Sequence, residues 1–189
     1  MYGPPGLTRM TEHLIAAFAE LPVHVLGEGE LDRVYRAVID DAGGRPRTRR
    51  DFVGRDAEVL LDAAGLRARK PVGLLVAPVE RDHPLFWMEQ FCPLLPVVRT
   101  KDSDAAIELG VQAEGGNRHT AMMYSNFPPN VERFAREVST VVTVVNGCSL
   151  RGLGAEGEGY PGFAIGTVTG EGITSPRHFA QVRRVARIR

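Results

Sequence analysis

The sequence has few of the residues and none of the segments that mark disulfide-rich, zinc-binding or membrane-spanning proteins. Only two of its 189 residues are cysteines, Cys92 and Cys148, so reduced thiols are expected rather than a disulfide framework. Neither stands in a CxxC or Cys/His spacing, so we expect no metal site. No apolar run approaches the roughly 18–20 residues of a membrane span, and the first residues lack both parts of a signal peptide. We therefore expect a cytoplasmic protein without a membrane partner.

An excess of charge of one sign is also missing. Lys and Arg together number 23, and so do Asp and Glu, so no global field draws the chain to nucleic acid or anionic lipid. Two short arginine clusters, at 45–50 and 183–189, are interpreted as a solvated loop and a solvated chain end. The hydrophobic fraction of 43% and the charged fraction of 24% are ordinary for a soluble globular protein. The length of 189 residues allows one domain with an apolar core. The balanced charge leads us to expect no nucleic-acid partner.

Helical and strand patterns alternate along the chain. Helical spacing is found over residues 8–21 (with Thr8 or Thr11 as N-cap), 30–40, 54–64 (with Gly65 as C-terminal cap), 84–91, 103–113 and 128–139. Short apolar runs without alternation occupy residues 72–79, 94–98, 120–124 and 141–145. Such runs favour strands that are covered on both faces, as in a parallel sheet. We therefore predict an α/β fold with right-handed crossovers.

Two stretches interrupt this alternation. Residues 41–50 (DAGGRPRTRR) are polar and are predicted to form a mobile loop. Residues 147–175 are rich in glycine, with nine glycines between Gly147 and Gly172, where average composition would place about two. The preferred interpretation is a long ordered loop that lines a site or a subunit contact and is held by Tyr160 and Phe163. A flexible linker is the alternative.

Residue chemistry alone favours structural roles for the polar and aromatic candidates. His119 lies beside the apolar run at 120–124, where a lone histidine is more often a structural hydrogen-bonding residue than a catalytic one. Glu89 and Phe91 fall at the end of the helical pattern at 84–91, where a surface carboxylate and a core ring are the simpler interpretation. The order of several motifs along the chain reverses these preferences.

Six motifs occur in a fixed order. They are RDFVGRDA at 50–57, EQFCP at 89–93, GGNRHTA at 115–121, VNG at 145–147, GAEGEGY at 154–160 and TGEGITS at 169–175. In this order they resemble the end of the catalytic domain of CoA-acylating aldehyde dehydrogenases, the acetaldehyde and propionaldehyde enzymes of ethanolamine and propanediol utilisation. The resemblance implies an α/β fold with the three-layer parallel sheet of that domain, truncated at its N-terminal side, with residues 1–189 as its C-terminal part.

The resemblance also implies a reaction in two halves. In the first half, a cysteine thiolate attacks a short-chain aldehyde, hydride passes to NAD⁺, and a thioester of the enzyme is formed. In the second half, the thiol of coenzyme A takes the acyl group from this thioester. By resemblance, Glu89 binds the nicotinamide ribose hydroxyls, since a carboxylate accepts hydrogen bonds from a vicinal diol. Phe91 then lies against the nicotinamide. His119 is the base that deprotonates the thiol of coenzyme A, whose pKa of about 8.5 keeps it protonated at pH 7.

In this family the nucleophilic cysteine, the oxyanion-binding asparagine and the nucleotide-binding half belong to upstream residues. Neither Cys92 nor Cys148 stands in the family's Asn-x-Pro-Cys context. Cys92 replaces a glycine of aldehyde dehydrogenases in general and is interpreted as packing, while Cys148 stands where the family has proline. Asn146 is expected to tie down the loop after its strand through bonds to the backbone. We therefore expect the chain alone to be inactive until an N-terminal half completes it.

Two further hypotheses stay open. The chain could be a non-catalytic scaffold subunit or degenerate remnant that forms a homo-oligomer or pairs with a full-length homologue, since the catalytic domains of the family join through sheet edges. It could also be a thiol acyltransferase that uses Cys148 and His119. Surface left bare by a missing domain is expected to be apolar and exposed. By resemblance, the lumen of a bacterial microcompartment is an alternative location to the open cytoplasm.

Overall fold

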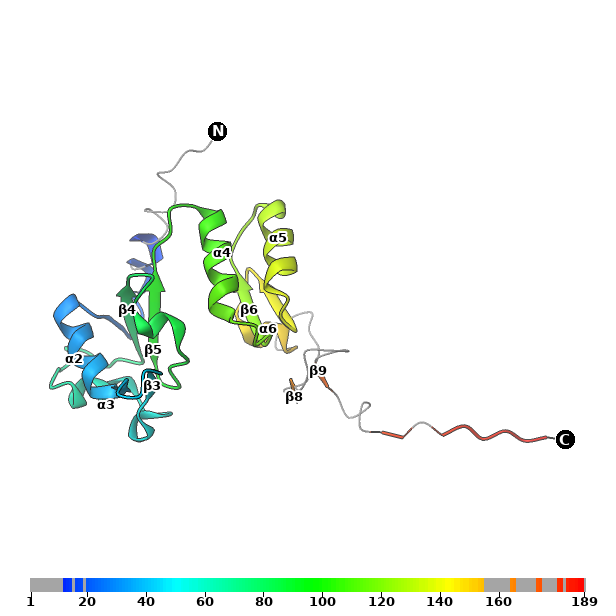
Figure 1. Ribbon diagram of the computed structural model, residues 1–189, viewed down its shortest axis with the longest axis horizontal. Coiled ribbons are helices and arrows are strands. Elements are labelled where there is room, and N and C mark those ends of the chain that lie inside the picture. Colours follow the sequence, from blue (N-terminus) through cyan, green and yellow to red (C-terminus); the bar gives the residue numbers. More distant parts are fainter. Residues whose placement is uncertain are drawn as a thin grey trace. The chain divides into compact units, whose positions relative to one another are not determined.

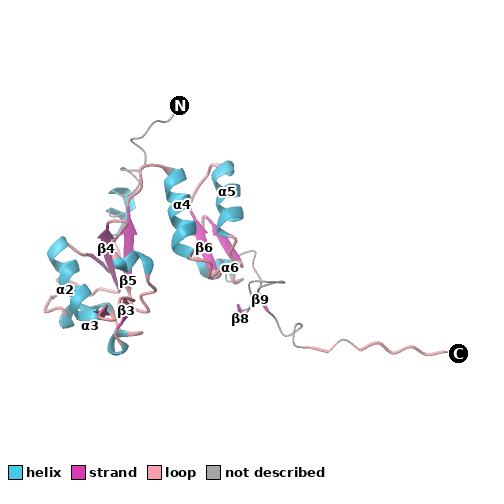
Figure 2. Ribbon diagram, in the orientation of Figure 1, coloured by secondary structure: helices cyan, strands magenta, loops and turns pink. Residues whose placement is uncertain are grey.

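Parallel strands flanked by helices form the described part of the chain (Figure 1, Figure 2). The computed structural model describes residues 12–14, 16–18, 20–154, 164–165, 173–174, 180–181 and 183–188. The chain divides into two units, Met1–Ser103 and Asp104–Arg189, and each is described by itself. Both contain parallel strands joined through helices, which confirms the predicted α/β class.

A three-stranded parallel sheet is the centre of unit 1. Its strands are β1 (Val23–Val25), β4 (Leu74–Val79) and β5 (Leu94–Val98), in the order β1-β4-β5. The side chains of three successive β4 residues, Leu75, Val76 and Ala77, are fully buried. Since successive side chains point to opposite faces, β4 is covered on both of them, as its continuous apolar run predicts. The short strand β1 escaped prediction because it has only three residues after Pro22.

Helices cover both faces of this sheet. One face packs against α2 (Glu28–Val38) and α3 (Ala57–Ala63), whose buried side chains join Leu75 and Ala77 in the main core. On the other face of the sheet, residues 12–14 and 16–18 are helical. Leu14 and Phe18 of this segment line a cavity together with Val76 of β4. The predicted N-caps of this helix, Thr8 and Thr11, lie outside the described residues.

The start of α2 shows why this helix begins where it does. The side chain of Glu30 accepts a hydrogen bond of 3.0 Å from the backbone N–H of Gly27, which would otherwise be an unsatisfied donor at the helix start. This bond lowers the pKa of the Glu30 carboxyl. His24 Nε2 lies 3.0 Å from the same carboxylate, so Glu30 links β1 to the first turn of α2.

The polar stretch at 41–50 folds back as the turn of a hairpin. Strand β3 (Arg47–Thr48) pairs antiparallel with β2 (Ile39–Asp40), and Arg47 Nη2 lies 3.0 Å from Asp40 Oδ2. Neither strand was expected from the sequence, because each has only two residues. The mobility of residues 41–50 stays a prediction.

Two helices of unit 1 are shorter than the sequence predicts. In place of a helix over 54–64, a 3₁₀ turn at Arg50–Phe52 is followed by α3, which begins at Ala57. Gly65 has a φ of +65° just after the C-cap of α3, which confirms its predicted role. The helix expected over 84–91 is wrong beyond Trp87: a 3₁₀ helix, η2, covers Pro84–Trp87, and the backbone is extended at Met88.

Unit 2 contains a two-stranded parallel sheet between helices. β6 (Thr120–Met123) pairs with β7 (Val142–Val145), close to both predicted strands. On one face, α4 (Ser103–Glu114) and α5 (Pro128–Val138) supply Ile107, Phe134 and Val138, which pack against Ala121 and Met123. On the other face, the short helix α6 (Ser149–Gly152) lies against Val142 and Val144 of β7. This gives unit 2 three layers.

A single arginine ties α5 to α4. Arg133 of α5 places Nη1 2.6 Å from Asp104 Oδ1 and Nη2 3.5 Å from Glu108 Oε1, both on α4. Its Nε donates to Glu137 one helical turn further along α5. Because one guanidinium meets three carboxylates, the group fixes the spacing of the two helices that cover β6.

The glycine-rich stretch at 147–175 is described only in part. Its described pieces are α6 and the two-residue strands β8 (Ala164–Ile165) and β9 (Ile173–Thr174), which pair antiparallel. Tyr160 and Phe163, the predicted anchors, lie outside the described residues, as do Glu156, Glu158 and Glu171. The role of this stretch as a site or oligomer loop stays a prediction.

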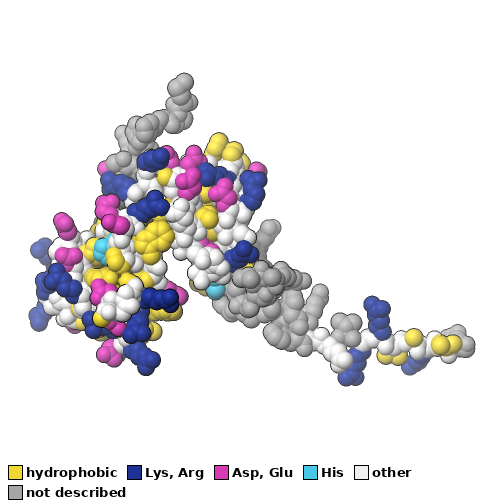
Figure 3. Space-filling view, in the orientation of Figure 1, with side chains coloured by type: hydrophobic (Ala, Val, Ile, Leu, Met, Phe, Trp, Pro, Cys, Tyr) yellow, Lys and Arg dark blue, Asp and Glu magenta, His cyan; other side chains and the backbone are white. Residues whose placement is uncertain are grey.

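Large apolar side chains reach the surface of both units among charged ones (Figure 3). In unit 2, Met122, Tyr124, Phe127 and Val145 at the ends of β6 and β7 are 39–66% exposed. Apolar surface of this kind was expected if a further domain normally covers it. Within the described ranges, no helix combines the length and the apolar character needed to cross a membrane.

Replacing Gly152 by alanine is expected to loosen the contact between α6 and β7. An alanine Cβ would lie 2.5 Å from Val142 Cγ1 and 2.6 Å from Val144 Cγ2, both buried in the sheet. Such overpacking costs about 1–3 kcal/mol. We expect faster hydrogen exchange at the β7 amides of Gly152→Ala, measured by mass spectrometry, and a lower urea midpoint.

Gly29→Ala is the matched control, because this glycine lies on α2 and its added Cβ meets nothing within 4 Å. Alanine favours a helix interior over glycine by about 1 kcal/mol, so stability should hold or rise. Unchanged β7 exchange in Gly152→Ala would contradict the close packing of α6.

Candidate functional site

Glu89 and Phe91 lie on a loop that connects η2 to β5. The loop follows Trp87 and enters the amino end of β5 at Leu94. Its backbone is held at several points: Gln90 O accepts from Thr48 Oγ1, and Phe91 O accepts from the N–H of Gly54 at 2.8 Å. Both side chains of interest are exposed, and within the described part of the chain Glu89 forms no ion pair. Of the simpler interpretation, the surface carboxylate holds for Glu89, although on a loop rather than a helix, whereas the core ring is wrong for Phe91.

Phe91 adopts a backbone conformation that aromatic residues avoid. Its φ is +51°, in the left-handed region, and its side chain is 58% exposed. Core packing does not explain a phenylalanine at this position, because the ring is exposed. The positive φ does not explain it either, because glycine adopts this backbone conformation more easily. A strained residue that holds an apolar ring in solvent is a feature of ligand-binding positions.

Cys92 follows Phe91 on the same loop. It is half-buried and packs against the main core of unit 1, and burial raises the pKa of its thiol. A thiol with a raised pKa carries less thiolate near neutral pH, so it is a poorer nucleophile. The structure agrees with its interpretation as a packing residue.

His119 lies on a tight loop at the amino end of β6. Gly115, Gly116 and Arg118 all have positive φ, and the Glu114 carboxylate accepts from the backbone N–H groups of Gly116 and His119 at 3.0 and 3.3 Å. The side chain is exposed. His119 Nδ1 lies 2.8 Å from Thr120 Oγ1, and the other ring nitrogen has no hydrogen-bond partner among the described residues. An oriented ring with one free nitrogen can take a proton from a ligand.

Asn146 ties down a loop through bonds to the backbone, as predicted, but the expectation that this is the loop after its own strand β7 is wrong: the loop follows β6. At the carboxyl end of β7 its Oδ1 accepts from Ser125 N at 2.9 Å, and its Nδ2 donates to Ser125 O at 3.1 Å. Its φ of +54° is tolerated because asparagine enters the left-handed region more readily than other residues. The side chain thus joins the two loops that leave β6 and β7.

Cys148 precedes α6 and is exposed. Its side chain makes no capping bond to the helix. Nothing in the described part of unit 2 thus marks it as the relocated nucleophile of a thiol acyltransferase, and that hypothesis gains no support.

The candidate residues divide between the two units. Glu89 and Phe91 belong to unit 1, whereas His119, Asn146 and Cys148 belong to unit 2. Within the ranges that the structure describes, no group of three or more His, Cys, Asp or Glu side chains could hold a metal ion. Sequence reasoning missed Glu114 and Thr120, which orient His119; the only signal was their closeness to it in the chain.

Sequence comparison finds relatives that are much longer than this chain. No family model matches it. It is 37% identical over 176 residues to a propanal dehydrogenase (CoA-propanoylating) of Salmonella typhimurium, a match that covers 93% of this chain and 37% of the relative. It is 42% identical over 144 residues to an acetylating acetaldehyde dehydrogenase of the same organism, covering 76% of this chain and 31% of the relative. The chain thus spans about a third of the length of these curated relatives.

Solved structures give the same result. A propionaldehyde dehydrogenase of Rhodopseudomonas palustris, solved with bound propionyl-CoA, matches with a TM-score of 0.84 at 32% identity over 93% of this chain and 38% of that one. A propionaldehyde dehydrogenase from the fucose utilisation microcompartment of Clostridium phytofermentans matches with a TM-score of 0.83 at 29% identity, over 92% and 39%. The α/β fold with parallel sheets is therefore that of acylating aldehyde dehydrogenase structures.

The two thiols are expected to differ in reactivity. Cys148 is exposed, whereas Cys92 is half-buried with a raised pKa, so at pH 7.5 a disulfide reagent such as 5,5′-dithiobis(2-nitrobenzoate) should label Cys148 roughly tenfold faster or more. Cys148→Ser should remove the fast phase and Cys92→Ser the slow one. Equal rates would contradict the packing of Cys92.

Proposed function

Because this chain corresponds in sequence and in fold to about a third of a CoA-acylating aldehyde dehydrogenase, we propose that it forms part of the pocket where such an enzyme makes a thioester. In that reaction a short-chain aldehyde and coenzyme A become an acyl-CoA while NAD⁺ is reduced. The observation that supports this most strongly is the 37% identity over 93% of the chain to a CoA-propanoylating enzyme. The exposed, left-handed Phe91 and the oriented His119 fit the same proposal.

The loop before β5 fits the nicotinamide end of NAD⁺. Bound there, NAD⁺ would accept the hydride released by the aldehyde carbon. The exposed carboxylate of Glu89 would accept hydrogen bonds from the ribose hydroxyls, and the ring of Phe91 would lie against the nicotinamide. The bond from Gly54 N–H to Phe91 O holds the backbone of Phe91 in place before any ligand arrives, which reduces the ordering needed on binding.

His119 would act in the second half-reaction. Its free ring nitrogen would take the proton of the coenzyme A thiol, and the resulting thiolate would attack the thioester carbonyl. The enzyme thiolate would then leave. Thr120 would orient the imidazole through its contact with Nδ1, and the Glu114 carboxylate would hold the backbone of His119 through its N–H.

The attacking cysteine of the first half-reaction would be supplied by residues outside this chain. Cys92 faces the core, and neither cysteine stands in the family's sequence context. Donors for the developing oxyanion must also be preorganised, and the family's asparagine is not among these motifs. We therefore propose that the chain works together with a segment that contributes both groups.

A second candidate function is that of a non-catalytic subunit that pairs with a full-length homologue or with itself. The exposed apolar side chains at the ends of β6 and β7 favour it, because they offer a surface for association. Location in a bacterial microcompartment is likewise a proposal, supported by the relative from the fucose utilisation microcompartment.

The chain alone is expected to show no aldehyde oxidation. Propanal, NAD⁺ and coenzyme A are incubated with the purified 189-residue chain, and NADH is followed by its absorbance. We expect no turnover above background. Turnover that Cys148→Ser abolishes would overturn the assignment of the nucleophile to residues outside the chain.

A chimera tests the proposed roles directly. This chain replaces the matching segment of the Salmonella propanal dehydrogenase, and acyl-CoA and NADH formation are measured separately. His119→Ala should slow acyl transfer to coenzyme A by about 10²-fold or more while a single-turnover burst of NADH remains. Glu89→Gln should raise the KM for NAD⁺ with a smaller effect on the acyl-transfer step.

His13→Ala is the control for His119, because His13 is exposed on the helical segment of unit 1 and belongs to none of the motifs. It should leave both half-reactions unchanged. If His119→Ala behaves like His13→Ala in an active chimera, the base is another group. An inactive chimera that still assembles would favour the scaffold function.

A further inference from the structure

A cavity opens at the end of the unit 1 sheet that the proposed function does not use. Its volume is about 730 Å³, within the range of small-molecule sites. Glu80 follows the last residue of β4, and Arg99 follows the last residue of β5; the pairing of Val79 with Val98 makes these two residues neighbours. Glu89 and Phe91 precede β5, at the amino edge of the sheet. The cavity is therefore at the carboxyl edge, which in open α/β sheets is a common place for ligands.

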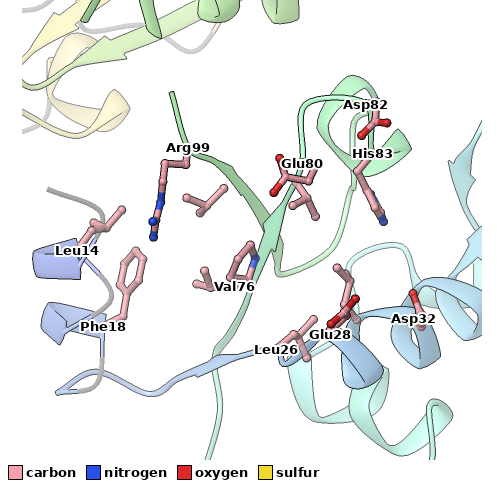
Figure 4. Close-up of a pocket in the computed structure, with 14 residues that line it drawn as sticks. Leu14, Phe18, Leu26, Glu28, Asp32, Val76, Glu80, Asp82, His83 and Arg99 are labelled. Atoms are coloured by element: carbon pink, nitrogen blue, oxygen red, sulfur yellow. The ribbon is translucent and has the colours of Figure 1, made fainter. Parts of the chain in front are cut away.

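The floor of the cavity is apolar. Val76 is fully buried, and Leu26 and Leu31 are nearly so. Leu14 and Phe18 form the side wall opposite α2, as Figure 4 shows. An aliphatic group of several carbons can be removed from water here, and each buried CH₂ favours binding by about 0.8 kcal/mol.

The rim of the cavity carries an excess of negative charge. Glu28, Glu80 and Asp82 line it, and within the described residues none of the three takes part in an ion pair. A fourth carboxylate, on Asp32, lies 3.6 Å from Arg36 Nη2 and is partly compensated. Arg99 is the arginine of the lining, so three uncompensated carboxylates face one guanidinium.

One ring nitrogen of the remaining polar group of the rim, His83, is already occupied. His83 Nδ1 accepts a hydrogen bond of 3.2 Å from Leu85 N, and its ring meets Tyr35 edge to face with centroids 5.4 Å apart. The imidazole thus has a structural role in holding η2.

This charge pattern disfavours NAD⁺ and coenzyme A, whose phosphates would meet the carboxylates. It favours a compact cation with an apolar portion. We propose that the cavity binds an aliphatic organic ammonium ion, with the ammonium group between Glu28 and Glu80 and the hydrocarbon part against Phe18 and Val76. The proposal is independent of the thioester chemistry, because it uses the opposite edge of the sheet.

Three probes with the same hydrocarbon tail test the charge preference. The 189-residue chain is titrated with n-hexylammonium, 1-hexanol and hexanoate by isothermal calorimetry. Hexylammonium should bind most tightly and hexanoate most weakly. Raising the ionic strength well above about 0.15 M should weaken hexylammonium binding, since exposed charges are screened.

Variants of exposed side chains locate the site without disturbing the core. Glu28→Gln and Glu80→Gln should each weaken hexylammonium binding roughly two- to fivefold, the range of exposed charge pairs. Arg99→Gln should leave it unchanged or strengthen it. Glu132→Gln, an exposed carboxylate of α5 in unit 2, is the matched control and should have no effect. Circular dichroism and thermal midpoints verify that each variant is folded.

Equal affinities for the three probes would overturn the proposal, because the cavity would then select only for apolar volume. The proposal would also be overturned if hexanoate bound most tightly and Arg99→Gln removed this binding. The cavity would then be a site for carboxylates. The proposal would also be overturned if Glu28→Gln and Glu80→Gln bound hexylammonium as tightly as the control Glu132→Gln.

Discussion

The parallel pairing of β4 with β5 decides where every functional candidate of unit 1 lies. Leu75 pairs with Leu94 and Val79 with Val98, so the two strands run side by side for five residues. The loop with Glu89 and Phe91 leads into β5 and is therefore fixed at one edge of the sheet. Glu80 and Arg99, which come directly after the two strands, are fixed at the other edge. This single register thus puts the two proposed sites at opposite edges of one small sheet.

Strained backbone positions coincide with the motifs that carry the resemblance. Four non-glycine residues have positive φ among those described: Phe91, Arg118, Asn146 and Ser139. The first three lie in the EQFCP, GGNRHTA and VNG segments, while Ser139 is the C-cap of α5. Left-handed backbone costs about 1 kcal/mol or more for such residues and persists only where the surroundings enforce it. Here the bond from Gly54 N–H to Phe91 O, the bond from His119 N–H to the Glu114 carboxylate and the two bonds between the Asn146 side chain and the Ser125 backbone do so.

The two units reach their stability by different routes. Unit 1 has one large apolar core in which α2, α3 and η2 pack against β4. Unit 2 has smaller apolar clusters on the two faces of β6 and β7, together with the Arg133 group that joins α4 and α5. Its strand ends also leave apolar side chains exposed. Exposed apolar surface of this kind is consistent with a chain that spans about a third of the length of its relatives.

The sequence alone was enough for the α/β class, for the strands at 94–98 and near 72–79, 120–124 and 141–145, and for the family, because continuous apolar runs and ordered motifs are local signals. It predicted a loop-holding role for Asn146 but not the loop that is held, because the bonded residue, Ser125, lies 21 residues away in the chain. It could not give the end of η2 at Trp87, the hairpin of β2 and β3, or the exposure of Phe91. These depend on contacts between residues far apart in the chain, such as Thr48 with Gln90 and Gly54 with Phe91. Only the tertiary structure, by pairing β4 with β5, brings the charges of Glu28, Glu80 and Arg99 to one cavity, since no local pattern links positions so distant in sequence.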